Sequence, residues 1–314
     1  MEKFHHVSVL FDETMVALNI NPDGVYVDCT LGGAGHALGI SSKLSKNGRL
    51  IGIDQDEDAI IAASERLTDL NPKIDVVQGN FRDLAKILDS LKIDKIDGCL
   101  FDLGVSSHQI DTAERGFSYI KDGPLDMRMD KNADFSAKDV INKYTEEELG
   151  RIFKEYGEER WGNRIAKFIC NFRKEKTIET TFELIDIIDR AIPKDVRRNM
   201  EGHSAKRIFQ AVRIEVNHEL DSLEDTFKEA ALRLNPKGRL AIITFHSLED
   251  RIAKKTLKEL STDCICPKTY PICLCNHKKS VKLIGKPIRA TGEELNANRR
   301  AKSATLRVAE KLER

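Results

Sequence analysis

Residues 28–36 read Asp-Cys-Thr-Leu-Gly-Gly-Ala-Gly-His, and this stretch decides the fold that we expect. An apolar segment at residues 25–28 leads into it, and a segment with helical periodicity follows at about residues 37–45. A strand, a glycine-rich turn and a helix in this order bind nucleotide-like ligands, because glycines let backbone N–H groups approach the ligand. The stretch therefore predicts a ligand site beyond the carboxyl end of the first strand of an α/β sheet.

Strand and helix patterns continue to alternate after this stretch. We predict strands at residues 49–53, 74–78 and 96–101, separated by helices at residues 57–67 and 84–91. Strands that alternate with helices of about 10–15 residues are typical of a parallel, doubly wound sheet. The predicted fold class is therefore α/β, with a Rossmann-like sheet.

The alternation stops near residue 106 and resumes near residue 217. The segment between shows turn signals and helical stretches, with two capping boxes that pair Thr145 with Glu148 and Thr180 with Glu183. We predict an all-helical insertion at residues 107–216, which recognises the substrate, inside a sheet domain built from residues 1–106 and 217–314. The second part of that domain is expected to contain helices at residues 220–234 and 247–260 and strands at residues 239–245 and 304–309.

Two carboxylates flank the glycine-rich turn and bear on which ligand it binds. Asp54 ends the second strand, 19 residues after Gly35, where a carboxylate can accept hydrogen bonds from ribose hydroxyls. These features fit both a nicotinamide dinucleotide and S-adenosylmethionine. The turn lacks the Gly-x-Gly-x-x-Gly spacing, and Asp28 would repel a pyrophosphate but can lie beside an ammonium group. We therefore favour S-adenosylmethionine, with an oxidoreductase and a turn without a ligand as the alternatives.

The ends of the third and fourth strands add to the predicted site. Phe81 follows the third strand, where an adenine could stack on its ring, although a lone Phe at this position is more often a core residue. Residues 102–107, Asp-Leu-Gly-Val-Ser-Ser, follow the fourth strand, where the loop would face the methyl group and its acceptor. Three acids at three strand ends are hard to explain by packing, because a buried acid without a partner is costly.

Composition and charge are those of an ordinary globular enzyme. Of the 314 residues, 40% are hydrophobic and 32% charged, which suits one large or two modest domains. We expect a cytoplasmic protein without a membrane span, because no apolar run is long enough and residues 1–6 lack a signal-peptide core. The net charge is zero, yet residues 193–213 hold six Lys and Arg against two Asp and Glu, and residues 278–314 hold eleven against four. Such stretches suit a nucleic-acid docking face or a solvated surface.

Further motifs extend along the whole chain. They lie at residues 6–10, 102–107, 114–118, 122–130, 156–160, 209–214 and 245–251, and include Asp-Gly-Pro-Leu-Asp-Met-Arg-Met-Asp and Phe-His-Ser-Leu-Glu-Asp-Arg. With residues 28–36, they make the chain resemble the bacterial small-subunit (16S) ribosomal RNA N4-cytosine methyltransferase family. The chain departs from the family pattern at His108 and Arg299, which stand in place of prolines, and at Lys302, which stands in place of an arginine.

The resemblance implies a class I methyltransferase sheet with an inserted helical domain, and S-adenosylmethionine as the cofactor. It implies methylation of the exocyclic N4 of a decoding-centre cytosine, in a small subunit that is assembled or nearly so. A homodimer is compatible with it. The implied cofactor contacts are Ala34, Gly35, His36, Asp54, Phe81, Asp102 and Gln109. His36 could instead cap the following helix, and the departure at His108 affects the turn that carries Gln109.

The chemistry of the acceptor indicates which residues act on it. The cytosine amine is a poor nucleophile because its lone pair is delocalised, so hydrogen-bond acceptors facing its N–H groups would help to localise that pair. We assign this role to backbone carbonyls of residues 102–106 and name Asp102 and Ser106, with Ser107 beside it, as candidate catalytic residues. His246 and Glu249 are either an acid/base pair or part of a helix N-terminus that Ser247 caps.

Two sets of residues remain as further candidates. The predicted RNA contacts are Arg128, Arg213, Arg300 and Lys302, although Arg128 between two acids could be a structural ion pair. Four crowded cysteines, Cys264, Cys266, Cys273 and Cys275, could bind zinc. Each pair encloses one residue, whereas zinc sites usually have two to four, so a reduced cysteine-rich loop is the alternative. A non-catalytic RNA-binding protein that keeps a cofactor pocket is the remaining alternative to an enzyme.

Overall fold

The computed structural model describes residues 8–200, 202–267, 269–270 and 272–313, and the chain divides into two compact units. The sheet unit comprises residues 1–104 and 221–314, and the helical unit comprises residues 105–220. The boundaries predicted from sequence, 106 and 217, lie within four residues of these. Residues 1–7 and 314 of the predicted sheet domain, and with them the start of the motif at residues 6–10, lie outside the described residues.

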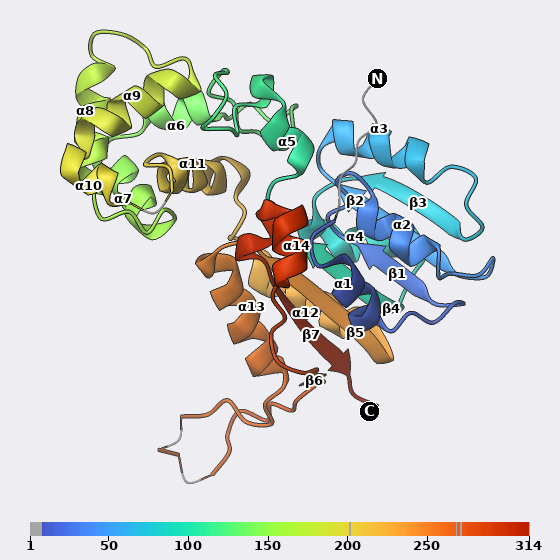
Figure 1. The fold of residues 1–314 in the computed structure, drawn as a ribbon. Helices are drawn as coiled ribbons and strands as arrows, with labels where there is room; N and C mark the ends of the chain where they lie inside the picture. Colours follow the sequence, from blue (N-terminus) through green and yellow to red (C-terminus); the bar gives the residue numbers. More distant parts are fainter. Residues whose placement is uncertain (1–7, 201, 268, 271, 314) are drawn as a thin grey trace. The chain divides into compact units, whose positions relative to one another are not determined.

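The sheet has seven strands in the order β3-β2-β1-β4-β5-β7-β6 (Figure 1). Strands β1 to β5 are parallel, and β7 is antiparallel to both of its neighbours. The predicted doubly wound α/β sheet is thus confirmed. The strands are β1 (Val25–Asp28), β2 (Arg49–Asp54), β3 (Lys73–Gln78), β4 (Ile96–Asp102), β5 (Leu234–Thr244), β6 (Val281–Leu283) and β7 (Thr305–Lys311).

Helices connect these strands, as the alternating pattern predicts. Two of them, α1 and α14, and the strand β6 are absent from the sequence prediction. The strand is three residues long and α14 six, which is too short for a hydrophobic period to show. The helices of the sheet unit are α1 (Phe11–Leu18), α2 (Gly35–Ser41), α3 (Glu57–Arg66), α4 (Leu84–Ser90), α12 (Leu223–Arg233), α13 (Ser247–Leu260) and α14 (Gly292–Ala297), with 3-10 turns η1 (Phe81–Asp83) and η3 (Arg299–Ser303).

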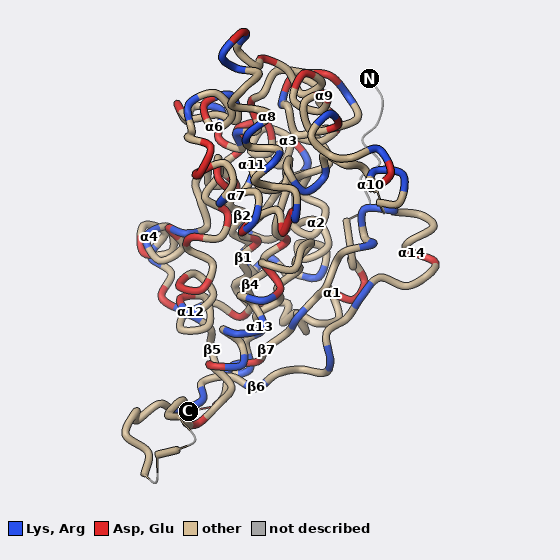
Figure 2. Tube along the Cα trace, turned by 90° about the vertical axis from the view of Figure 1, so that its left-hand side faces the viewer, with Lys and Arg blue, Asp and Glu red and all other residues tan. Residues whose placement is uncertain are grey.

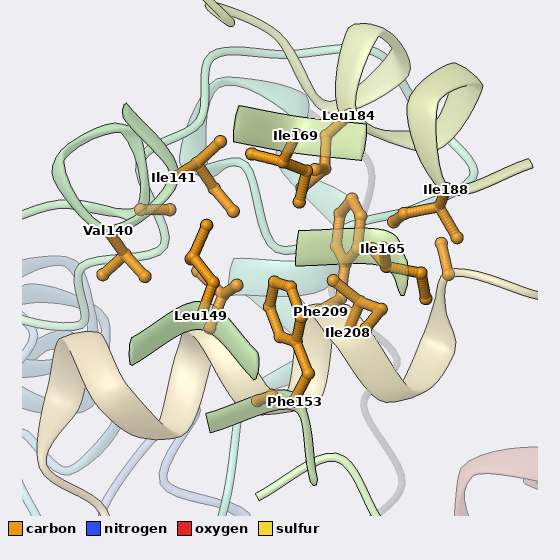
Figure 3. Close-up of a cluster of buried hydrophobic side chains, with 14 of the residues drawn as sticks. Val140, Ile141, Leu149, Phe153, Ile165, Ile169, Leu184, Ile188, Ile208 and Phe209 are labelled. Carbon is orange, nitrogen blue, oxygen red and sulfur yellow. The ribbon is translucent and has the colours of Figure 1, made fainter. Parts of the chain in front are cut away.

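The helical unit has a hydrophobic core of its own. Figure 3 shows Ile141, Leu149, Phe153, Ile165 and Phe209 converging from different helices, and all of them are buried. The described part of this unit holds no strand, only an isolated bridge between two residues. Its helices are α5 (Ser107–Asp111), α6 (Ala137–Lys143), α7 (Glu146–Glu155), α8 (Gly162–Phe172), α9 (Thr181–Ala191), α10 (Lys194–Arg198) and α11 (Lys206–Asn217), with a 3-10 turn η2 (Ala113–Arg115).

Both predicted capping boxes form in this unit. The Thr145 hydroxyl accepts from the N–H of Glu148, whose carboxylate accepts from the N–H of Thr145, and Thr180 and Glu183 do the same. These bonds satisfy N–H groups that a helix start leaves without intrahelical partners. They explain why α7 and α9 begin where the sequence predicts. Among the described residues, no helix is both long and apolar enough to span a membrane.

Candidate active site

Three carboxylates mark one edge of the sheet. Asp28, Asp54 and Asp102 are the last residues of β1, β2 and β4, and β1 pairs with the other two strands on its two sides. Since these strands are parallel, their carboxyl ends share one edge. The chain winds outward from β1 to β3 and then returns to β4 beside β1, so the strand order reverses here. In open α/β sheets, this reversal is where ligands bind.

Asp54 holds the glycine-rich turn in place. Its Oδ2 accepts a hydrogen bond from the N–H of Gly32 (2.7 Å), and its Oδ1 accepts one from the N–H of Asp56 (2.9 Å). Gly32 and Ala34 both adopt left-handed backbone conformations, with φ of 47° and 60°. Burial raises the pKa of Asp54 to about 6. The predicted ribose partner is therefore also the residue that shapes the turn.

Gly35 has little space around it. A Cβ at this position would lie 1.9 Å from the hydroxyl oxygen of Ser8, which no side chain can tolerate without a shift. A Cβ at Gly33 would meet its nearest atom, on Arg66, at an ordinary 3.6 Å. The close approach between Gly35 and Ser8 brings the first turn of α2 against the segment that precedes α1.

His36 lies between two segments and does not cap α2. Its side chain is 4% exposed, with Nε2 3.1 Å from the carbonyl oxygen of Val9 and Nδ1 3.5 Å from Oδ2 of Asp102. The ring of Phe11 stacks on it at 6.0 Å between centroids. Burial lowers the pKa of the imidazole, but the carboxylates of Asp102 and Asp28 outweigh burial, so its pKa lies above the ordinary value.

Asp102 has a carboxylate oxygen without a partner. Its backbone N–H donates to the hydroxyl oxygen of Thr30 (2.6 Å), and Oδ2 faces His36, but Oδ1 is buried and accepts no hydrogen bond from any described residue. An unsatisfied buried oxygen of this kind costs about 1–3 kcal/mol, and more when charged. It therefore points to a ligand that donates, and the ammonium group of S-adenosylmethionine supplies such donors.

Asp28 adds a second buried carboxylate to the same edge. It is 1% exposed, and burial raises its pKa to about 6. The charges of Asp102 and Asp54 contribute to this rise, while His36 and the backbone N–H of Thr30 oppose it. Three negative charges this close disfavour one another, so a cation at this edge would stabilise all of them. The donor set therefore fits the cofactor that the sequence predicts.

Three other predicted residues are engaged within their own units. Phe81 is half-buried at the start of η1 and packs edge-on against Phe101 at 5.8 Å, so it makes a core contact, and the adenine stack stays a prediction. Ser106 and Gln109 belong to the helical unit and form the capping box of α5: each backbone N–H donates to the other side chain, at 2.9 and 3.2 Å. The Ser-x-x-Gln spacing is a signal that could have identified this cap.

His246 and Glu249 also form a helix cap. His246 itself is the N-cap of α13, so the expectation that Ser247 caps this helix is wrong. Oε2 of Glu249 accepts hydrogen bonds from the N–H groups of Phe245 (2.8 Å) and His246 (3.3 Å). Glu249 is the third residue of the helix, and its carboxylate bonds back to the N-cap residue as in a capping box. The cap accounts for Oε2 of Glu249, while Oε1 lies 3.1 Å from Nε2 of His246, so the acid/base pair stays a prediction.

The four predicted RNA contacts divide into two kinds. The guanidinium of Arg128 donates to both carboxylate oxygens of Asp126 (2.9 and 2.6 Å) and to the carbonyl of Ala133, which is the structural ion pair foreseen as its alternative. Arg213, 16% exposed, makes a two-bonded pair with Glu219 (2.8 and 2.9 Å). The other two, in η3, have exposed side chains. Figure 2 shows basic and acidic residues interspersed among other residues in both units.

The sequence did not reveal two residues of this edge. Thr30 bonds the backbone of Asp102, and the carbonyl of Val9 lies against His36. A single threonine in a turn and a backbone carbonyl have no sequence pattern that would identify them as part of a site. Only the pairing of β1 with β4 and the approach of the segment before α1 bring them to the site.

The strand order, the antiparallel β7 and the carboxylates at the ends of β1, β2 and β4 define the class of protein, an S-adenosylmethionine-dependent methyltransferase. The chain belongs to the MraW methylase family, whose model matches residues 3–312. This membership decides against the oxidoreductase alternative.

Two similar proteins carry the name ribosomal RNA small subunit methyltransferase H. The protein of Clostridioides difficile (strain 630) is 55% identical over 311 residues, which cover 99% of this chain and 100% of that protein. The protein of Clostridium botulinum (strain Loch Maree / Type A3) is 56% identical with the same coverage. A solved rRNA methylase structure from Streptococcus thermophilus matches at 12% identity with a TM-score of 0.41, over 96% of this chain and 95% of that chain.

Proposed function

We propose that this protein transfers a methyl group from S-adenosylmethionine to the exocyclic N4 of a decoding-centre cytosine in small-subunit ribosomal RNA. The observation that carries the cofactor half of this proposal is the buried, unpartnered Oδ1 of Asp102 beside Asp28. The acceptor half is supported by the names of the two relatives, which are small-subunit RNA methyltransferases. The choice of N4 and of the decoding centre comes from the motif resemblance.

Each residue at the sheet edge has a proposed task in holding the cofactor. Asp102 and Asp28 accept from the ammonium group, and Asp54 accepts from the ribose hydroxyls. The backbone of residues 32–35 lies along the ligand, with Ala34 and Gly35 as contacts, and His36 keeps Asp102 oriented from 3.5 Å away. Phe81 and Gln109 are the remaining proposed contacts. When bound, the cofactor supplies an electrophilic sulfonium methyl group.

The protein's part in the reaction is to position the amine and to receive its hydrogen bonds. Alignment of an acceptor with a reacting bond can supply about 7–11 kcal/mol of the barrier. The carbonyls of residues 102–106 are the proposed acceptors for the amine N–H groups, and the carboxylate of Asp102 joins them only where the cofactor's ammonium group leaves it free. The hydroxyl oxygen of Ser106 accepts one bond from Gln109 and retains a lone pair for another. The target base must leave its stack to reach them.

The helical unit and the exposed basic residues have a proposed role in holding the RNA. We assign substrate recognition to the helical unit, in which Arg128 and Arg213 fix the local shape through their ion pairs. Arg300 and Lys302 are the proposed phosphate contacts. We place the reaction in the cytoplasm, on a small subunit that is assembled or nearly so, and light scattering would test whether the enzyme acts as a homodimer.

Transfer of a labelled methyl group tests this proposal. Small subunits from a strain that lacks this protein are incubated with the enzyme and labelled cofactor, next to the same RNA stripped of protein. We expect label in the subunits at a single N4-methylcytidine, with little in the naked RNA. Label at another nucleoside would overturn the acceptor assignment. Binding to subunits without any transfer would favour the non-catalytic alternative.

A further inference from the structure

The loop between α13 and β6, residues 261–280, carries four cysteines that methyl transfer does not use. Their Sγ atoms all lie within 4.8 Å of one another, although the outer two, Cys264 and Cys275, are eleven residues apart. The Sγ atoms of Cys273 and Cys275 are 3.6 Å apart, and those of Cys264 and Cys275 are 3.9 Å apart. All four thiols are free.

These separations match the geometry of one shared metal ion. Four sulfurs bonded to zinc at about 2.3 Å in a tetrahedron lie about 3.8 Å from one another. A disulfide joins only two sulfurs, at about 2.05 Å, so it does not account for the convergence of all four. We propose that Cys264, Cys266, Cys273 and Cys275 together bind one structural zinc ion.

Packing does not hold the tip of this loop. Its large apolar side chains are at least half exposed, among them Ile272 (72%) and Leu274 (70%). Figure 2 shows the loop as tan along most of its length, so ion pairs hold it at few points. A loop this long whose described residues form no helix or strand is uncommon in a compact domain. Ordering this loop costs conformational entropy, which another interaction must offset. A metal ion bound by four thiolates provides such an interaction.

The base of the loop, by contrast, is closed by ordinary hydrogen bonds. The N–H of Ser280 donates to the carbonyl of Leu260 (2.8 Å), and Lys279 pairs with Asp263 (2.8 Å). Nε2 of His277 lies 3.0 Å from the carbonyl oxygen of Glu259, so this imidazole belongs to the base. The donor set at the tip therefore consists of sulfur, as in closed structural zinc sites.

Two features of the tip suit thiolate ligands. The backbone N–H of Leu274 donates to Sγ of Cys266 (3.3 Å), a bond that stabilises negative charge on sulfur. Soft sulfur ligands select zinc over magnesium and calcium. The spacing of one residue within each pair is narrower than the usual two to four. The path of the loop compensates for this narrow spacing, because it brings the Cys264–Cys266 pair and the Cys273–Cys275 pair together.

The loop lies at the opposite edge of the sheet from the candidate active site. Val281, which follows the loop, pairs with Lys311 at the end of β7, while Arg239 near the start of the parallel part of β5 pairs with Glu310. Figure 1 shows the loop extending from the end of α13. Loss of zinc should therefore loosen the loop and leave cofactor binding unchanged.

Metal analysis of the full-length protein tests the proposal. Protein purified without chelators is analysed by plasma mass spectrometry, together with the double variant C266S/C273S and the control C170S, which removes a thiol outside the cluster. We expect about one zinc per chain in the wild type and in C170S, and almost none in the double variant. Cofactor binding, measured on the same samples, should be equal in all three.

A second measurement keeps the proposal testable if the double variant does not fold. Wild-type protein loaded with Co²⁺ in place of zinc should show the intense thiolate-to-metal absorption of a tetrahedral sulfur site. A chelator should then speed trypsin cleavage after Lys278 and Lys279. A wild-type protein that takes up no metal from a zinc-containing buffer would overturn the proposal. The same holds if Co²⁺ added to the reduced wild-type protein produces no thiolate-to-metal absorption.

Discussion

Nδ1 of His36 lies 3.5 Å from Oδ2 of Asp102, and the pair joins the first turn of α2 to the end of β4. The contact leaves the other oxygen of Asp102 buried and without a partner among the described residues. A buried imidazole thus fixes one side of the carboxylate and directs its free side toward a ligand. The proposed cofactor site depends on this arrangement as well as on the glycine-rich turn.

Replacement of Asp28 by Asn should stabilise the protein without ligand. Burial raises the folded-state pKa of Asp28 to about 6, so its contribution to stability is fully present below its unfolded pKa and is lost as the pH rises through about 6. Well above pH 6, D28N has no buried carboxylate charge, so its free energy of unfolding should exceed that of the wild type by up to about 3 kcal/mol. Thermal unfolding across pH measures this. An unchanged or lower melting temperature above pH 6 would contradict the burial argument.

Cofactor affinity should fall as the pH drops through about 6. Protonation of Asp28 and Asp54, whose pKa values both lie at about 6, removes charge that offsets the cofactor's ammonium group and weakens an acceptor for its ribose. Calorimetric titration at a series of pH values gives the dissociation constants. D28N should bind more weakly at high pH and show a shallower pH dependence. A wild-type affinity that stays constant through this range would argue against both assignments.

The contact between Gly35 and Ser8 can be tested with a pair of matched variants. G35A places a Cβ 1.9 Å from the Ser8 hydroxyl and should cost about 1–3 kcal/mol of stability, as overpacked sites do. G33A, whose Cβ has 3.6 Å to its nearest atom, serves as the control and should be close to neutral. Adding S8G to G35A should recover part of the loss. Equal melting temperatures for G35A and G33A would show that this approach is not tight.

The exposed basic residues of η3 can be separated from the cofactor site. R300A/K302A should bind small subunits more weakly and with a smaller dependence on salt, because fewer counterions are released. Its affinity for S-adenosylmethionine should equal that of the wild type. K86A, an exposed lysine on α4, is the control for a general loss of positive charge. Equal subunit binding by R300A/K302A and K86A would remove these two residues from the RNA interface.

The strand ends could be predicted from the sequence, while the contacts between them could not. Asp28, Asp54 and Asp102 each follow an apolar run, and parallel strands bring such ends to one edge. The contact of His36 with Asp102 depends instead on how α2 begins, which a sequence period does not encode. The sequence therefore predicted His36 only as a helix cap or as a cofactor contact, and not as a partner of Asp102.

The same limit applies elsewhere in the chain. The capping boxes at Thr145 and Thr180 were predictable because their signal lies within four residues. The cap that Ser106 and Gln109 form has an equally local signal, but Ser106 was assigned to the acceptor amine and Gln109 to the cofactor. The convergence of the four cysteines is a property of the loop's path, since their spacing alone left zinc and a reduced loop as alternatives.

Cofactor titration of D102N tests the central claim most directly. Asn keeps the shape of Asp102 but replaces a charged acceptor, and a hydrogen bond to a charged group is worth about 1.5–3 kcal/mol. We expect S-adenosylmethionine to bind about ten to a hundred times more weakly to D102N than to the wild type, while D12N, at an exposed position on α1, binds normally. Methyl transfer by D102N should be lost. Normal cofactor affinity and full methyl transfer in D102N would contradict the account.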